Sequence, residues 1–347
     1  MNTDPDIASD SEPGCLPPRE RYDLFAHEDI EQEIVTTWES GRLHHAWLIC
    51  GPRGVGKASL AWRIARRVLG AAPFPDYGPL GADPADPVCR QLEAQACPDL
   101  LLLRRPWDEK RKRWRAEITV DEARRAPAFF EKSAGAGGWR VCLVDSADDM
   151  NTNAANALLK TLEEPPQRGL LILISHAPGR LPATIRSRCR RLDLRLPSVE
   201  ATASWLQSNA GLSDASAARQ AAELSGGAPG RALALSVSGG VELADRIDSL
   251  VDKGRSASEK DIRQLADMVT GKTGAEKGPV FYGALRSAIQ RRSRAIALEG
   301  GNSEPWIEAW RSLNRLVRDS DGLYLDPKQT ALAALSLVTQ AARAELA

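Results

Sequence analysis

The segment GPRGVGKA, residues 51–58, has the residue types and spacing of a loop that binds the phosphates of a nucleotide. In such loops the glycines let backbone N–H groups approach the phosphates, the lysine neutralises them, and a following Ser or Thr hydroxyl ligates Mg²⁺. Here Ala58 follows the lysine, and Ser59 is turned away by a helical step of about 100°. The motif predicts that the nucleotide-binding residues are Gly51, Pro52, Arg53, Gly54, Val55, Gly56, Lys57 and Ala58.

A nucleoside triphosphatase also needs acidic residues at the end of a neighbouring strand. The apolar run at 141–144 ends in Asp145, the expected partner of the metal ion, but Ser146 stands where a glutamate would activate water. A serine is not a general base at neutral pH without help. Asp148 and Asp149 are expected to face the start of the next helix. The metal ligand and the base are therefore both missing, and we expect no intrinsic ATPase.

Three further polar residues are placed where they could meet a phosphate. Ser175 ends the apolar run at 170–174, and Arg231 begins a later helix from which it could reach a bound nucleotide. Arg188 precedes the last predicted strand and could enter the site of a neighbouring chain, where such an arginine is worth ~10³ or more in rate. On position alone, a surface arginine is the simpler interpretation of Arg188, because other arginines surround it: Arg186, Arg190 and Arg191.

The elements that must position these residues occur in the required order. An apolar run at 45–50 enters the glycine loop, and apolar residues then recur at helical spacing. A helix is expected at 29–40. Further apolar runs alternate with helical sequence, at 100–103, 141–144, 170–174 and 192–194. This alternation predicts an α/β fold with a parallel sheet covered on both faces.

Beyond Pro197 the sequence is almost entirely helical. Asp326 and Pro327 are a typical cap and first residue of the last helix. A second GKT, at 271–273, has no strand before it and is interpreted as a turn between helices. We expect four segments: a disordered tail at 1–18, an α/β core at 19–196, a small helical lid at 197–238 and a helical domain at 239–347.

Several segments together resemble the delta-prime family of bacterial DNA polymerase III clamp-loader subunits, namely HHAWLICGPRGVGKA, VCLVDSADDMNTNAANALLKTLEEPP, LPATIRSRCRRL, GGAPGRAL and LYLDPKQT. The resemblance covers nearly the whole chain after the tail. It implies an AAA+ fold, with a RecA-like core, a lid and a collar domain that joins five subunits into an open ring. It also implies a component of a DNA-directed DNA polymerase holoenzyme (a nucleotidyltransferase) and of its clamp-loading ATPase, acting in DNA replication. The implied partners are motor subunits, a delta-type subunit, the sliding clamp and, through the complex, primed DNA.

The family resemblance also assigns Arg188 as an arginine finger that acts in trans on the ATP site of an adjacent motor subunit. It implies a subunit that does not itself hydrolyse ATP. Two alternatives are an active AAA+ replication ATPase, which Ala58 and Ser146 disfavour, and a P-loop kinase, which has no use for the helical third of the chain. The residues leave open whether the degenerate loop holds ATP or ADP, and no other cofactor is expected.

Composition limits the remaining possibilities. Lys and Arg number 46, as do Asp and Glu, so no overall charge attracts nucleic acid. The basic run at 110–115 is the one patch suited to DNA phosphates, although most such runs are solvated. No apolar stretch reaches the ~18 residues of a membrane span, and the polar N-terminus indicates a cytoplasmic protein without a secretory signal. Cys89 and Cys97 are too few for a zinc site, so no metal is expected.

Overall fold

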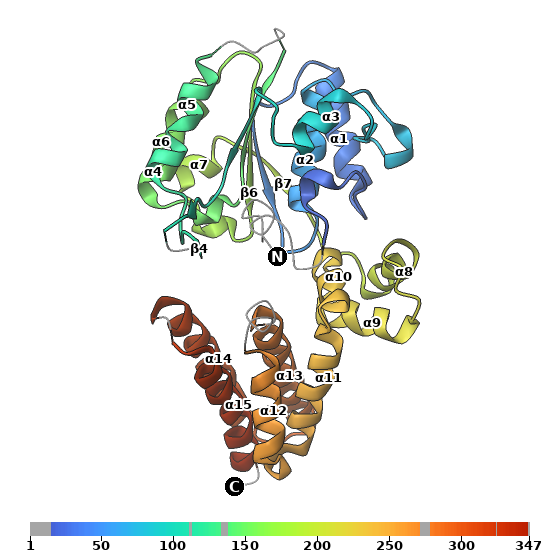
Figure 1. Ribbon diagram of the computed structural model, residues 1–347, viewed down its shortest axis with the longest axis vertical. Helices are drawn as coiled ribbons and strands as arrows, with labels where there is room; N and C mark the ends of the chain where they lie inside the picture. The colour runs from blue at the N-terminus through green and yellow to red at the C-terminus, as the bar shows by residue number, and fades with distance from the viewer. Residues whose placement is uncertain (1–14, 111–112, 133–137, 271–277, 324, 346–347) are drawn as a thin grey trace. The chain divides into compact units, whose positions relative to one another are not determined.

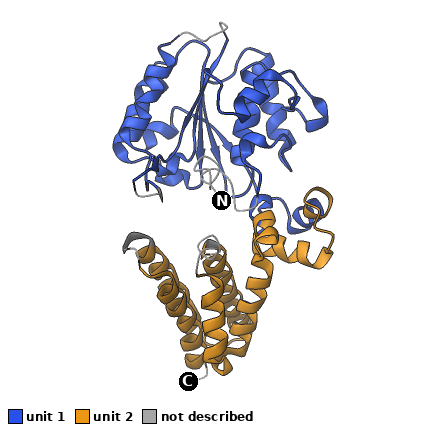
Figure 2. Cartoon of the chain, in the orientation of Figure 1, with its two compact units in different colours: residues 1–205, 226–231 blue, residues 206–225, 232–347 orange. Residues whose placement is uncertain are grey.

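The computed structural model describes residues 15–110, 113–132, 138–270, 278–323 and 325–345. These residues fall into two compact units, coloured separately in Figure 2. The first unit extends to residue 205 and includes 226–231, and the second takes in 206–225 and the residues from 232 onward. The four-part division expected from the sequence stays a prediction.

A five-stranded parallel sheet forms the centre of the first unit (Figure 1). Its strands follow the spatial order β2-β5-β6-β1-β7 and are β1 Ala46–Cys50, β2 Leu100–Leu103, β5 Arg140–Val144, β6 Gly169–Ser175 and β7 Arg190–Asp193. Every residue of β1, β5 and β6 is buried, which explains their nearly unbroken apolar sequence. The predicted α/β class with a parallel sheet is confirmed.

Helices cover both faces of this sheet, because successive strand residues point to opposite sides. Trp47 and Ile49 pack on the side of α1 Glu28–Glu39 and α2 Lys57–Val68. Leu48 and Cys50 pack on the other side. The remaining helices of the two faces are α3 Pro87–Glu93 beside α1 and α2, and α4 Val120–Ala123, α5 Arg125–Phe130, α6 Thr152–Glu163 and α7 Ala183–Arg186 opposite (Figure 1).

Short elements complete the first unit. The basic run lies in a hairpin of β3 Trp107–Asp108 and β4 Arg113–Trp114, where the two tryptophan rings meet edge to face, with 5.2 Å between their centroids. Residues 111–112 of that run lie outside the described residues. The 3₁₀ helices here are η1 Pro18–Glu20, η2 Pro75–Tyr77, η3 Ala147–Asp149 and η4 Pro178–Arg180.

The second unit is helical around its own apolar core, in which Phe281, Trp306 and Leu335 are fully enclosed. Its helices are α9 Ala215–Leu224, α11 Gly240–Lys253, α12 Glu259–Met268, α13 Gly278–Leu298, α14 Glu304–Leu323 and α15 Pro327–Ala344, with η5 Gly254–Ser256. Two helices begin in the first unit and end in the second, α8 Val199–Asn209 and α10 Pro229–Val237. The predicted helical C-terminal region is confirmed.

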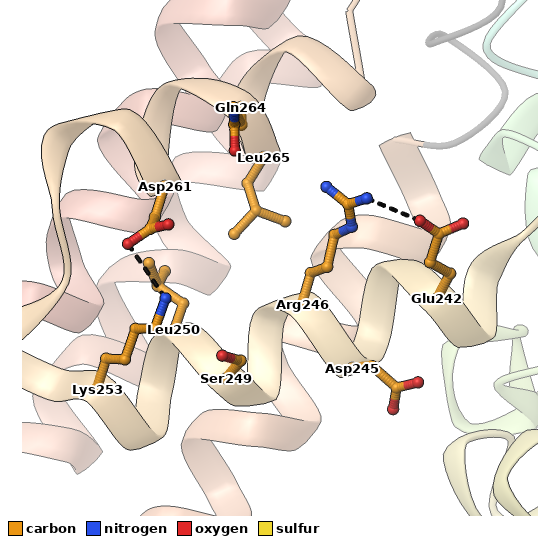
Figure 3. Close-up of a pocket in the computed structure, with 9 residues that line it drawn as sticks. All are labelled: Glu242, Asp245, Arg246, Ser249, Leu250, Lys253, Asp261, Gln264 and Leu265. Carbon is orange, nitrogen blue, oxygen red and sulfur yellow. Dashed lines mark hydrogen bonds and ion pairs between the residues drawn. The ribbon is translucent and has the colours of Figure 1, made fainter.

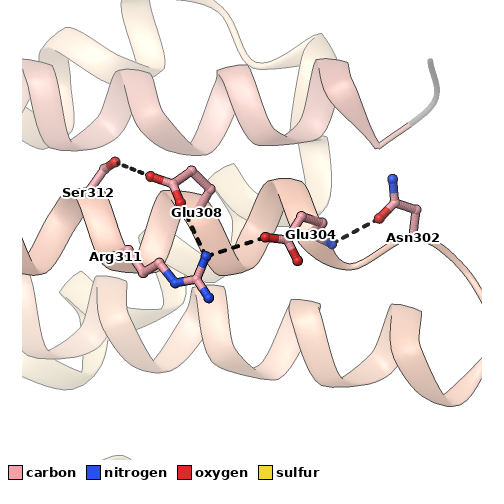
Figure 4. A network of polar contacts seen from close by, with 5 residues as sticks. All are labelled: Asn302, Glu304, Glu308, Arg311 and Ser312. Carbon is pink, nitrogen blue, oxygen red and sulfur yellow. Dashed lines mark hydrogen bonds and ion pairs between the residues drawn. The ribbon is translucent and has the colours of Figure 1, made fainter.

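Local signals in this unit behave as the sequence indicates. The carboxylate of Asp326 accepts a hydrogen bond from the N–H of Gln329 at 2.8 Å, and α15 begins at Pro327. The exposed face of α14 carries Arg311, 3.4 Å from both Glu304 and Glu308 (Figure 4). Exposed pairs of this kind contribute little stability, so they mark a solvated face. The second GKT, at 271–273, lies outside the described residues.

Candidate functional site

The glycine loop joins the end of β1 to the start of α2, the place where a phosphate-binding loop belongs. Gly56, the residue before the helix, has φ +107°, a conformation that other residues rarely adopt. Lys57 begins α2 and is only 3% exposed. The predicted order of strand, glycine loop and helix is therefore present.

The ammonium group of Lys57 binds the carbonyl groups of its own loop. Its Nζ donates to the O of Gly51 at 2.8 Å and to the O of Pro52 at 2.6 Å. Burial lowers the pKa of Lys57 to about 8, although nearby Asp145 acts in the opposite direction. Ala58 packs against the apolar core and offers no ligand for a metal ion.

Asp148, which the sequence reasoning did not place in the site, joins the ends of β5 and β6. Its carboxylate accepts hydrogen bonds from the hydroxyl groups of Ser146 at 3.0 Å and Ser175 at 2.7 Å. It also accepts from the backbone N–H groups of His176 and Ala177. Burial alone would raise the pKa of Asp148, but the four donors outweigh it and hold this pKa below its usual value. Both serines are thereby engaged in holding a carboxylate.

The expectation that Asp148 and Asp149 face the next helix is wrong. The turn η3 follows β5 and directs Asp148 toward the end of β6, while Asp149 lies 3.2 Å from Arg105. Burial raises the pKa of Asp149 against the opposing influence of Arg105. The helix α6 is capped instead by Asn151, whose side chain accepts from the N–H of Ala154. The contacts of Asp148 depend on β5 and β6 being adjacent. Ser146 could therefore have predicted them only if the order of the strands had been known.

Neighbouring charges also act on His176, which follows Ser175. Burial, together with Lys57 and Arg53, lowers the pKa of His176 to about 4, so its ring is neutral at pH 7. Its Nδ1 is buried, and the structure gives it no hydrogen-bond partner. The neutral imidazole of His176 thus lies near two cations, Lys57 and Arg53, and near the carboxylate of Asp148.

The start of α10 packs directly on the glycine loop. The N–H of Gly230 donates to the O of Gly54 at 2.8 Å, and a Cβ added to Gly54 would lie 2.7 Å from the N of Arg231. His27 contacts the same loop through its Nε2, 3.0 Å from the O of Val55. The structure therefore brings Arg231 beside the loop, as its predicted role requires, while contact with a nucleotide stays a prediction.

Arg188 lies away from this loop, toward the amino ends of the strands. It precedes β7, whose first residue Arg190 pairs with Trp47, four residues before Gly51. With about 3.3 Å per strand residue, Arg190 is roughly 13 Å from Gly51 along the strands, and Arg188 lies in the turn before it. Its guanidinium contacts residues of this chain, the O of Thr184 at 3.0 Å and Glu163 at 2.8 Å.

The predicted site residues thus form two groups. One group lies at the carboxyl ends of the strands and consists of Gly51, Pro52, Arg53, Gly54, Val55, Gly56, Lys57, Ala58, Asp145, Ser175 and Arg231. Arg188 alone lies at the amino ends. Arg188 and the glycine loop of this chain therefore do not form one site.

Other candidates in the structure offer less chemistry. A cavity of about 250 Å³ lies along α11 and α12, but Arg246 is paired with Glu242, and Lys253 with Asp261 (Figure 3). Arg104 lies over the Trp114 ring of the basic hairpin, 5.5 Å from its centroid. Among the described residues, no cluster of three or more His, Cys, Asp or Glu is placed to hold a metal ion. None of the helices described here combines the length and apolarity that crossing a membrane requires.

Comparisons with known proteins agree on one group of relatives, the subunits of DNA polymerase III. Residues 26–198 match the model of the family described as DNA polymerase III, delta subunit. The chain is 40% identical over 185 residues to DNA polymerase III subunit delta' of Pseudomonas aeruginosa, which is 53% of each protein. It is 35% identical over 215 residues to the Escherichia coli subunit delta', 62% of this chain and 61% of that protein. The matches span between half and two thirds of these relatives.

More distant similarities extend to other proteins. The E. coli subunit tau is 32% identical over 186 residues, 53% of this chain and 26% of tau. A solved DNA polymerase III gamma subunit-related protein from Thermotoga maritima covers 92% of this chain and 100% of its own, with TM-score 0.45 and 17% identity. T. maritima RuvB gives TM-score 0.44 and 14% identity, over 91% of this chain and 88% of its own. The similarity to these two solved structures is too low to indicate what the present protein does.

Proposed function

Through residues 26–198 this chain belongs to the family of the DNA polymerase III delta subunit, and on that premise we propose that it is a clamp-loader subunit of DNA replication. In this proposal the chain does not hydrolyse ATP and donates Arg188 to the ATP site of a neighbouring motor subunit. Its other partners are a delta-type subunit, the sliding clamp and, through the assembled complex, primed DNA. The complex works in the cytoplasm.

The degenerate loop supports the absence of hydrolysis. Ala58 cannot ligate Mg²⁺, and the hydroxyl group of Ser146 is not basic at neutral pH, unlike the carboxylate of a glutamate. Ser175 is tied to the carboxylate of Asp148. A nucleotide held by the loop would therefore stay intact, and to reach its phosphates Lys57 would have to leave the O of Gly51 and of Pro52.

The position of Arg188 is the observation that carries the proposal. A guanidinium group presents five N–H donors and suits the oxygens of a transferring phosphoryl group. Arg188 is surface-accessible and lies toward the amino ends of the strands, away from the loop of its own chain. The loop of this chain lies elsewhere, and in this proposal a neighbouring chain supplies the phosphate.

Reconstitution with candidate motor subunits tests the proposal. The isolated chain should show no Mg²⁺-dependent ATP hydrolysis above background. In the reconstituted complex, Arg188→Ala should reduce ATP hydrolysis stimulated by DNA and clamp, whereas the exposed neighbour Arg186 provides a matched control in Arg186→Ala. Hydrolysis by the isolated chain would refute the non-hydrolysing role, and equal activity of the two variants would refute the role of Arg188.

A further inference from the structure

We propose that Glu163 is a positioning residue for Arg188. Its carboxylate holds the guanidinium group of Arg188 in one orientation before the guanidinium meets a nucleotide on a neighbouring chain. The inference rests on the proposed function of Arg188 and adds to it a second residue, on a different element. Arg188 Nη2 lies 2.8 Å from Glu163 Oε1, and Nη1 donates to the O of Thr184 at 3.0 Å. The two ends of the guanidinium group are thus held separately.

The backbone that carries Arg188 is fixed by its surroundings. The N–H of Arg188 donates to the O of Ile185 at 3.1 Å, and the Ile185 side chain is fully buried. Two residues after Arg188, Arg190 begins the pairing of β7 with β1. The freedom of Arg188 is therefore confined to its long side chain, which is the part that Glu163 holds.

Glu163 is fixed as firmly on the other side. It is the last residue of α6, directly after Leu162, which is buried and whose O lies 3.2 Å from Nε2 of His45. Pro165 and Pro166 follow, and proline has a fixed φ. Pro166 packs so closely on the chain that a Cβ added to Gly169 would lie 2.3 Å from its Cγ. The backbone that carries Glu163 is therefore fixed, and its carboxylate lies 2.8 Å from Arg188.

The position of Glu163 at the carboxyl end of α6 is unfavourable for a negative charge. The carboxyl end of a helix bears a partial negative charge, so an acidic residue there is unfavourable unless a cation lies near. Arg188 is that cation. Its contacts with Glu163 and Thr184 use two of the five guanidinium N–H donors, so Glu163 can hold the side chain while others face a phosphate.

Pre-orientation has a kinetic consequence. A long arginine side chain loses rotamer freedom when it is fixed, and a partner that has already fixed it removes part of that cost from the reaction. Side chains of the pair are 36% and 50% exposed, for Arg188 and Glu163 respectively, and exposed pairs contribute modestly. We therefore expect an effect well below that of removing Arg188.

The test uses Glu163→Gln in the reconstituted complex, which keeps an acceptor and removes the charge. The kcat for ATP hydrolysis at the adjoining site should fall about fivefold, with KM for ATP changed less than about twofold. Glu164→Gln, which changes the adjacent acidic residue, should match the wild type. In an Arg188→Ala background, Glu163→Gln should have no further effect, because its role is exerted through the arginine.

Three results would overturn the positioning role. They are wild-type kcat in Glu163→Gln, an equal loss in Glu164→Gln, or an undiminished loss in the Arg188→Ala background. An unchanged thermal unfolding midpoint of Glu163→Gln verifies that the fold is intact. If Arg188→Ala itself retains full activity, the proposed function fails, whereas loss in Arg188→Ala beside wild-type Glu163→Gln refutes only the inference about Glu163.

Discussion

At the scale of single residues, the carboxylate of Asp148 holds the ends of β5 and β6 together. The carboxylate collects donors from Ser146, Ser175 and the backbone after β6. In a hydrolysing site, the residue at 146 would have to act on water, and the one at 175 would be available to a phosphate. Here both hydroxyl groups are oriented by the same acceptor. Asp148 therefore has a structural role, because it fixes the side chains of Ser146 and Ser175.

Asp148→Asn should lower the free energy of unfolding of the first unit by about 2–3 kcal/mol, because a charged acceptor with four donors becomes a neutral amide with its own N–H groups. Urea denaturation measures the difference. Asp149→Asn is the control, since its partly exposed pair with Arg105 should contribute less than about 1 kcal/mol. Equal effects of the two substitutions would contradict the role assigned to Asp148.

The contribution of Asp148 should also depend on pH. Its pKa in the folded protein lies below the unfolded value, about 3.9, so folding favours the ionised form. The stabilisation is then fully present above the unfolded pKa and is lost as the pH falls through the folded pKa. The stability difference between wild type and Asp148→Asn should be constant from pH 6 to 7 and shrink below about pH 4. A difference that grows on acidification would show the opposite sign.

Individual residues differ in how far the sequence predicts them. Gly51 to Lys57 lie in one short segment, so their type and spacing suffice to predict the loop. Asp148 and Ser175 are 27 positions apart and meet because β5 and β6 are adjacent, which no local pattern specifies. The contact between Glu163 and Arg188 depends in the same way on how α6 and β7 are placed by the sheet.

At the scale of elements, the glycine loop is joined to the start of α10 through backbone atoms. Gly54→Ala should disrupt this contact, because the added Cβ would collide with the N of Arg231. The substitution also places a non-glycine residue at φ +75°, which strains the backbone. Gly41→Ala is a matched control, with φ +67° and no atom within 4 Å of the added Cβ. We expect faster amide hydrogen exchange around Gly230 in Gly54→Ala alone. Equal exchange in the two variants would show that strain, and not contact, decides.

Elements were predictable where a single local signal defines them. Four strands of the parallel sheet coincide with predicted apolar runs, and the start of α15 was predicted from Asp326 and Pro327. The strand β7 begins with two arginines and overlaps its predicted run, 192–194, only in part. The sheet order β2-β5-β6-β1-β7 was not predicted, because long-range pairing leaves no trace in periodicity. The short helix α5 is six residues long, too brief for a helical repeat to identify it.

At the scale of the whole molecule, the chain contains two units with separate apolar cores. The proposed function uses two separate groups of residues, the glycine loop and Arg188. The two groups of site residues lie at opposite ends of the strands of one sheet in the first unit. A ring of similar subunits would bring the Arg188 end of one chain to the loop end of the next. In the proposed function, this arrangement would give a subunit that does not hydrolyse ATP a direct effect on hydrolysis, confined to one ATP site.

The most direct measurement is the single-turnover rate of ATP hydrolysis in a complex where only the ATP site adjoining this chain is competent. A competent site elsewhere would mask the loss, so the other motor sites carry inactivating substitutions. With Arg188→Ala the rate should fall about 10³-fold or more, as removal of an arginine finger implies, while Arg186→Ala should leave it unchanged. A rate in Arg188→Ala within about twofold of the wild type would contradict the account.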